Sequence, residues 1–134
     1  MTIAEKAVGF HACGYNCAQC VLKACREFYP ELDDNTLARL ASGFGGGVCC
    51  GEICGALTGG VMAIGLSNSF DESSREAVLS SKETLKKLIQ SYNQDFKDNF
   101  DSLLCARLKG GKFSCNELIA FSADAAEKMI LNNK

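Results

Sequence analysis

GFGGGVCCGEICGALTGG, residues 43–60, is the stretch around which the rest of the chain is organised. It holds eight of the 13 glycines and three of the nine cysteines. Because glycine lets another backbone or a cofactor approach closely, backbone rather than bulky side chains should define the local surface. Cysteine thiolates are soft metal ligands and nucleophiles. The stretch therefore predicts a sulfur site lined by backbone N–H groups.

The composition is that of an ordinary globular domain. The chain has 134 residues, of which 47% are hydrophobic and 22% charged, and we expect a single domain over 1–134. A net charge of −2 without a basic block predicts no nucleic-acid partner. The longest apolar run, Ile53 to Leu66, is too short to cross a bilayer, so we expect no membrane partner.

Cysteine usage indicates the compartment. Nine cysteines is an odd number, and residues 1–14 lack the apolar core of a secretory signal. We therefore expect a cytoplasmic protein, where a reducing environment favours metal or redox use of thiols over a disulfide framework.

Apolar periodicity and capping residues predict an all-α, single-domain bundle of about six helices with a Gly/Cys-rich loop. Four capping boxes mark helix starts: Thr2 with Glu5, Asn16 with Gln19, Ser73 with Glu76, and Ser114 with Glu117. Asp33 or Asp34 caps a further helix, and residues 102–109 form a short helical turn that begins after Ser102. The Gly/Cys loop should end near Gly51, with a buried helix from about Ile53 in which Gly55 and Gly59 let a neighbouring helix pack closely. Phe96 and Phe100 should pack on the long helix after Ser73, or at its end.

Four cysteines fall at predicted helix starts. Cys17 and Cys115 each follow an N-cap, Cys54 lies near the start of the buried helix, and Cys105 lies in the turn after Ser102. Helix N-termini carry free N–H groups and a partial positive charge, which predicts a lowered thiol pKa at these positions. If the four helix starts converge, they form one sulfur centre.

These residues also carry a family resemblance. In order, NCAQ at 16–19, FGGG at 44–47, CGALTG at 54–59, Cys105 and Cys115 resemble the C_GCAxxG_C_C family of redox-active proteins over most of the chain. The resemblance implies a small helical protein with four signature cysteines, here Cys17, Cys54, Cys105 and Cys115. It also implies a relation to the non-haem domain of split-Soret cytochromes, where an iron–sulfur centre accompanies haem. No Cys-x-x-Cys-His motif is present, so covalent c-type haem is not expected.

The remaining cysteines lie outside this signature. Cys13, Cys49 and Cys50 are candidate extra ligands or resolving thiols, because they are near signature positions in the sequence. Cys20 and Cys25 lie inside an apolar helical pattern, and Cys25 is expected to pack in the core. The single histidine, His11, is expected on a helix surface or partly buried, and Glu52 as a solvated carboxylate.

Three hypotheses follow. In the first, Cys17, Cys54, Cys105 and Cys115 bind an iron–sulfur cluster that transfers electrons to a redox partner protein, with Gly45, Gly46, Gly47 and Gly55 supplying close backbone N–H groups. In the second, the protein is a thiol–disulfide oxidoreductase with Cys54 as nucleophile. In the third, the cysteines form a structural zinc or metal-binding module. A homodimer would help a small domain shield a large cofactor.

Overall fold

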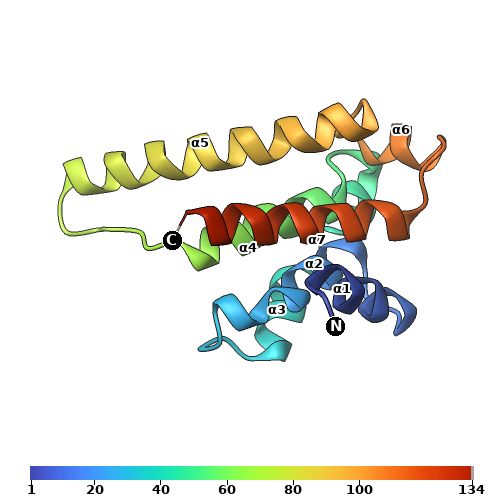
Figure 1. The fold of residues 1–134 in the computed structure, drawn as a ribbon, viewed down its shortest axis with the longest axis horizontal. Coiled ribbons are helices and arrows are strands. Elements are labelled where there is room, and N and C mark those ends of the chain that lie inside the picture. The colour runs from blue at the N-terminus through green and yellow to red at the C-terminus, as the bar shows by residue number, and fades with distance from the viewer. Residues whose placement is uncertain (134) are drawn as a thin grey trace.

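The computed structural model describes residues 1–133 and consists of helices joined by short loops (Figure 1). The elements are α1 (Ile3–Ala12), α2 (Cys17–Ala24), the short turn η1 (Arg26–Phe28), α3 (Asp34–Leu40), the turn η2 (Gly47–Gly51), α4 (Gly55–Ser67), α5 (Arg75–Phe100), α6 (Cys105–Lys109) and α7 (Cys115–Asn132). Across the described residues the only β-pairing is an isolated bridge between Ile53 and Leu104. The all-α prediction is confirmed, with seven α-helices in residues 1–133 against the predicted six or so.

Most of the predicted helix starts are confirmed. Thr2 and Asn16 both form complete capping boxes, in which side chain and backbone satisfy each other's free donors. Asp33 and Ser114 accept the N–H groups of the third residue of their helices. Such caps satisfy donors that a helix leaves unpaired, so short polar residues before an apolar run are a dependable local signal.

The start of α5 differs from the prediction by one residue. Ser74, not Ser73, is the N-cap, and its hydroxyl accepts the N–H of Ala77. The predicted pairing of Ser73 with Glu76 is therefore wrong. The helix runs unbroken to Phe100, so Phe96 and Phe100 are part of it, and both are buried.

The starts of α4 and α6 were also predicted too early. Helix α4 begins at Gly55 rather than near Ile53, and α6 begins at Cys105 rather than after Ser102. The reason is the bridge between Ile53 and Leu104, which holds both segments extended just before their helices. No local sequence signal predicts a pairing across this separation.

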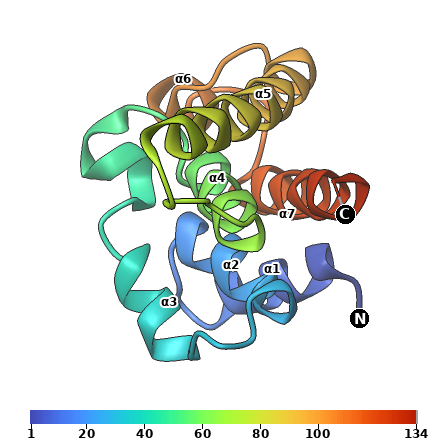
Figure 2. The same cartoon turned by 90° about the vertical axis from the view of Figure 1, so that its left-hand side faces the viewer.

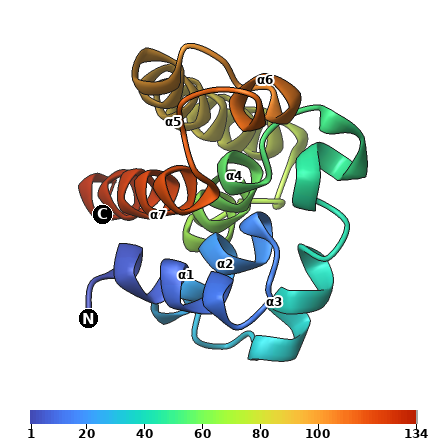
Figure 3. The same ribbon diagram turned by 90° about the vertical axis from the view of Figure 1, so that its right-hand side faces the viewer.

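Helix α4 lies at the centre of the bundle. It packs against α2, α5 and α7, and Figures 2 and 3 show α4 and α7 side by side, with α5 on one side of them and α1 and α2 on the other. Its contact with α2 depends on Gly59, whose Cβ, if present, would lie 2.7 Å from the carbonyl oxygen of Ala18. The predicted close packing at Gly59 is confirmed. In the described part of the chain no helix has the length and apolarity to cross a membrane.

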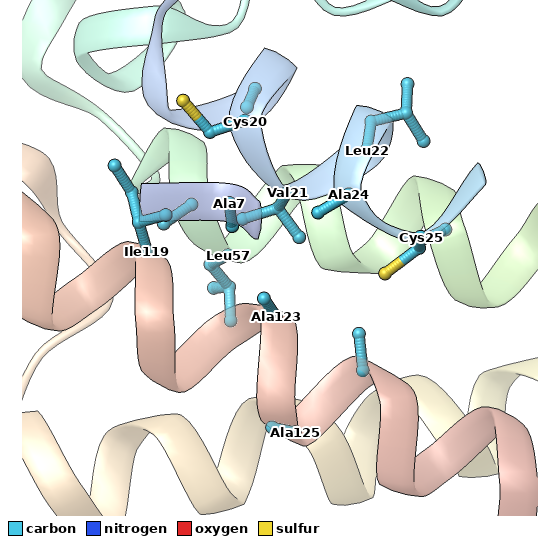
Figure 4. Packing of buried hydrophobic residues seen from close by; sticks show 14 of the residues in the cluster. Ala7, Cys20, Val21, Leu22, Ala24, Cys25, Leu57, Ile119, Ala123 and Ala125 are labelled. Atoms are coloured by element: carbon cyan, nitrogen blue, oxygen red, sulfur yellow. The ribbon is translucent and has the colours of Figure 1, made fainter. Parts of the chain in front are cut away.

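The core joins three helices from distant parts of the sequence. Val21 of α2, Leu57 of α4 and Ile119 of α7 gather there (Figure 4), and all three are fully or almost fully buried. At the other end, Phe100 of α5 packs edge-on to Phe113 and Phe121, with ring centroids 4.8 Å and 5.1 Å apart. This aromatic cluster ties the end of α5 to α7, and so positions the segment that carries α6.

Candidate functional site

Each of the four signature cysteines lies at the N-terminus of a different helix. Cys17, Cys105 and Cys115 are the first residues of α2, α6 and α7, and Cys54 is the N-cap residue of α4. Cys54 and Cys105 are buried, whereas Cys17 and Cys115 are half-buried. The first residues of a helix have backbone N–H groups without helical partners, and these groups favour negative charge nearby.

The four cysteines are neighbours in space. The side chains of Cys17 and Cys115 contact each other, and Cys54 also acts electrostatically on Cys17. Cys54 in turn feels the charges of Cys105 and Cys115. The four thiols therefore lie near one another, as the sequence suggested, with Cys54 as the residue that relates Cys105 to Cys17 and Cys115.

A short backbone pairing brings Cys54 and Cys105 together. The N–H of Cys54 donates to the carbonyl of Leu103 at 2.8 Å, and the N–H of Cys105 donates to the carbonyl of Glu52 at 2.6 Å. These two bonds flank the bridge between Ile53 and Leu104. The backbone thus places the starts of α4 and α6 side by side, independently of any bound group.

Burial raises the pKa of two of the four thiols. Desolvation, followed by the charges of Cys115 and Cys54, raises the pKa of Cys17 to about 12. Desolvation also raises the pKa of Cys54, although the backbone N–H groups of Leu57 and Ala56 act in the opposite direction. The predicted lowering of thiol pKa at helix starts is wrong for these two residues, because loss of water and neighbouring thiols outweigh the helix N-terminus.

Three of the four candidate glycines allow close approach of the backbone at the site. A Cβ on Gly45 would overlap the side chain of Asn16, and one on Gly47 would lie 2.7 Å from the Cβ of Cys105. A Cβ on Gly55 would lie 2.8 Å from the carbonyl oxygen of Phe44 and 3.4 Å from the Cβ of Cys17. Gly46 meets nothing within 4 Å, and its role is conformational, with φ of +62°.

The turn η2 has unusual backbone geometry. Val48 and Cys49 have φ of 58° and 59°, in the left-handed region that L-residues with side chains avoid. Each such residue costs roughly 1–2 kcal/mol, and the β-branched Val48 is the less tolerant of the two. The turn is therefore strained, and packing against neighbouring residues must hold it.

The other five cysteines fall into two groups. Cys13, Cys49 and Cys50 are exposed. Cys20 in α2 and Cys25 at the end of α2 are buried, and the sulfurs of these two residues point in different directions (Figure 4). Core packing of Cys25 is confirmed. Cys20 contributes to the raised pKa of Cys17, in keeping with the three-residue spacing of the two cysteines on one helix.

The histidine lies beside one of the four helix starts. His11 is half-buried, as expected, and its Nδ1 is 2.7 Å from the Oδ1 of Asn116, the residue after Cys115. This contact joins α1 to the start of α7 and had no signal in the local sequence. Glu52 is exposed, as expected.

The metal-binding capacity of these thiols follows from their number and their arrangement. Within residues 1–133, no three His, Cys, Asp or Glu side chains are arranged to hold one metal ion. A tetrahedral zinc site would need four sulfurs within about 2.3 Å of a common point. Four neighbouring thiols do match the donor set of an iron–sulfur cluster, whose several metal atoms spread the ligands further apart.

Fold and site define the class of protein: an all-α domain with four cysteines on converging helix N-termini. Residues 15–129 match the family described as "Putative redox-active protein (C_GCAxxG_C_C)", and the chain belongs to this family. The search of curated proteins and the search of solved structures each returned no match.

Proposed function

We propose that Cys17, Cys54, Cys105 and Cys115 hold an iron–sulfur cluster and that the protein transfers electrons through it. The observation that carries the proposal is the convergence of these four thiols from four separate helix starts. A cluster held by four cysteines supplies one-electron chemistry, with a potential set by its surroundings. We also propose a reducing compartment such as the cytoplasm, because metal or redox use of nine cysteines requires that they stay reduced.

The chain's own residues support this role in three ways. The relative exposures of Cys54 and Cys105 are 3% and 6%, which restricts water at two of the four ligands. The backbone N–H groups of Ala56 and Leu57 act on the Cys54 sulfur and favour its thiolate form. Gly47 and Gly55 bring the backbone close to Cys105 and Cys17 without side chains that would fill the space.

Anaerobic purification tests the proposal. Broad visible absorption, with iron and acid-labile sulfide in matched amounts, is the expected result. Alanine at any one of Cys17, Cys54, Cys105 or Cys115 should lower both contents, whereas Cys13→Ser, an exposed thiol outside the site, should not. A colourless wild-type protein without iron, or full iron content in all four alanine variants, would refute the proposal.

One observation favours a second candidate, a dithiol–disulfide function. Cys17 and Cys115 are in side-chain contact, so they, rather than Cys54 with a partner, are the pair we assign to it. Oxidation would join the two sulfurs and pass two electrons and two protons to an external disulfide, which becomes two thiols. Alkylation with mass mapping in glutathione redox buffers tests this: a reversible Cys17–Cys115 link in metal-free protein supports it, and its absence at all buffer ratios excludes it.

A zinc module has less support. It requires at least three ligands around one point, and the described residues contain no such group. Zinc analysis of the same anaerobic preparation addresses it directly, because a zinc protein is colourless and contains no sulfide.

A further inference from the structure

Positive charge is concentrated on the segment that joins α5 to α7. Residues 102–116 contain three cations and no acidic residue, whereas the whole chain has a net charge of −2. All three cations are exposed. They are Arg107, Lys109 and Lys112, and together they form the basic patch.

The basic patch lies close to two of the four signature cysteines. Arg107 and Lys109 belong to α6, whose first residue is Cys105. Since a helix rises 1.5 Å per residue, both lie within about 6 Å of Cys105 along the helix axis. Lys112 precedes Cys115 by three residues, so their Cα atoms are no more than about 11 Å apart. A molecule that binds the patch is therefore next to the sulfur site.

The charge of the basic patch is available to another molecule. Within residues 1–133, none of its three side chains has an ion-pair partner. Lys82, Lys86 and Lys87 of α5 are also unpaired in this part of the chain, but Glu83 lies among them. They belong to the N-terminal half of α5, at the far end of the molecule from α6 (Figure 1). Only the basic patch combines uncompensated positive charge with proximity to the signature cysteines.

A cavity of about 250 Å³ opens within the patch. Arg107 and Lys112 line it, together with Asp101 and Ser102. Two cations against one carboxylate leave the lining positive, so an acidic side chain is the group that it fits. Lys109 is not part of the lining. The positive charge therefore extends over a wider area than one small anion would contact.

An apolar surface borders the patch. The turn η2 touches α6, since a Cβ on Gly51 would lie 3.2 Å from the Cβ of Ala106, and Figures 2 and 3 show the two segments adjacent. Ala106 is exposed, and Val48 of the same turn is 48% exposed. Apolar side chains beside charged ones are the usual composition of a protein–protein interface.

We propose that the basic patch is the docking surface for an acidic one-electron carrier protein. The inference rests on the proposed electron transfer, because it names the class of partner that the sulfur site serves. Docking there places the carrier beside Cys105 and Cys115. The protein loses one electron and the carrier gains it, so no bond forms and no further reactant is needed. Electron-transfer encounters use small, weak interfaces, for which charge attraction supplies the association rate.

Cross-linking tests the position of the docking surface. The probe is an acidic plant-type ferredoxin, mixed with the full-length protein. A water-soluble carbodiimide joins a lysine amine to a neighbouring carboxylate as an amide, so cross-linked peptides identify the lysines that face the probe. We expect cross-links at Lys109 and Lys112. Cross-links at the α5 lysines in place of these two would overturn the proposal.

Matched triple variants test the contribution of the patch. The first combines Arg107→Gln, Lys109→Gln and Lys112→Gln, and the control combines Lys82→Gln, Lys86→Gln and Lys87→Gln, so each lowers the net charge by three. At about 0.01 M salt the first should associate with ferredoxin at least about tenfold more slowly than the wild type, because electrostatic steering accounts for 10–10³-fold in such rates. The control should change the rate much less. At about 0.15 M salt the difference should shrink, since the screening length falls from about 30 Å to 8 Å.

The result is separable from the test of the cluster. Equal association rates for the two triple variants, or a rate that does not depend on salt, would overturn the docking surface even where iron and sulfide are present. Conversely, a protein without iron that still binds ferredoxin through the patch would refute the cluster and support the docking surface. Measuring the metal-free and the anaerobically purified protein side by side distinguishes the two failures.

Discussion

Gly59→Ala is the substitution that most directly tests how the site is positioned. Gly59 lies in α4, where that helix touches Ala18 of α2. Ala18 is the residue that follows Cys17. An added Cβ would lie 2.7 Å from the carbonyl oxygen of Ala18 and 3.0 Å from both its Cα and the Cβ of Val21. The first distance is about 0.7 Å short of the 3.4 Å at which ordinary contact begins. Because two of these atoms belong to the backbone, the two helices must separate.

The expected magnitude has two parts. Overpacking of this kind costs about 1–3 kcal/mol, whereas replacing glycine by alanine inside a helix gains up to about 1 kcal/mol. Gly65→Ala, in the same helix, is the matched control because a Cβ there meets nothing within 4 Å. The helix-propensity gain is common to both variants, so the difference between them isolates the packing cost. We expect Gly59→Ala to be less stable than Gly65→Ala by about 1–3 kcal/mol.

Urea unfolding, monitored by circular dichroism, measures this difference as a change in the urea concentration at the midpoint, with the dependence of the unfolding free energy on urea unchanged. Separation of α2 from α4 should also move Cys17 away from Cys54, so Gly59→Ala should contain less iron after anaerobic purification, while Gly65→Ala should match the wild type. Equal stability of the two variants would refute the packing argument. Equal iron content despite lower stability would show that the two cysteines do not depend on this contact.

Three further predictions concern strain, capping and pH. Val48→Gly should raise the free energy of unfolding by up to about 1 kcal/mol. The reason is that relief of the left-handed strain contributes more free energy than the added entropy of the unfolded chain costs. A loss of stability would show that the turn is not strained. Ser114→Ala should lower the free energy of unfolding by about 1 kcal/mol, and Asn16→Ala should lower it further. The Asn16 amide also donates to the carbonyls of Ala41 and Ser42, at 3.3 Å and 3.1 Å. Equal losses of stability in thermal unfolding would contradict this. Burial, followed by the charges of Glu127 and Glu27, raises the pKa of Cys25 to about 12. A thiol in the unfolded chain ionises near pH 8.5, so the free energy of unfolding should fall between about pH 8.5 and pH 12. Cys25→Ala should make this decline shallower by up to about 1.36 kcal/mol per pH unit, measured by urea unfolding. An unchanged slope would mean that Cys25 ionises equally in the folded and unfolded states.

Much of the local structure was predictable because its causes are local. Asn16 and Ser114 cap helices through side-chain bonds to residues three positions on, and the position of Cys17 and Cys115 follows from those caps. Ser73 shows the limit of this reasoning. Two adjacent serines are both candidate caps; Ser74 caps the helix, while the N–H of Ser73 donates to the carboxylate of Asp71 in the loop that precedes α5.

The chemistry of the site was less predictable, because it depends on water and on distant neighbours. A helix start lowers a thiol's pKa only where the thiol stays solvated, and the burial of Cys17 and Cys54 reverses the sign. Likewise, Cys49 and Cys50 are close to Cys54 in sequence, yet a strained turn leaves both of them exposed.

The sequence by itself determined the helical class and the capped starts of α2 and α7, with Cys17 and Cys115 at those starts, because residues a few positions apart set each of these. Tertiary structure alone decided that the four starts meet. The pairing of residues 52–54 with residues 103–105, and the close approach of α2 to α4 at Gly59, join segments far apart in the chain. Such contacts form only when the whole core is buried at once, and no short stretch of sequence contains that information.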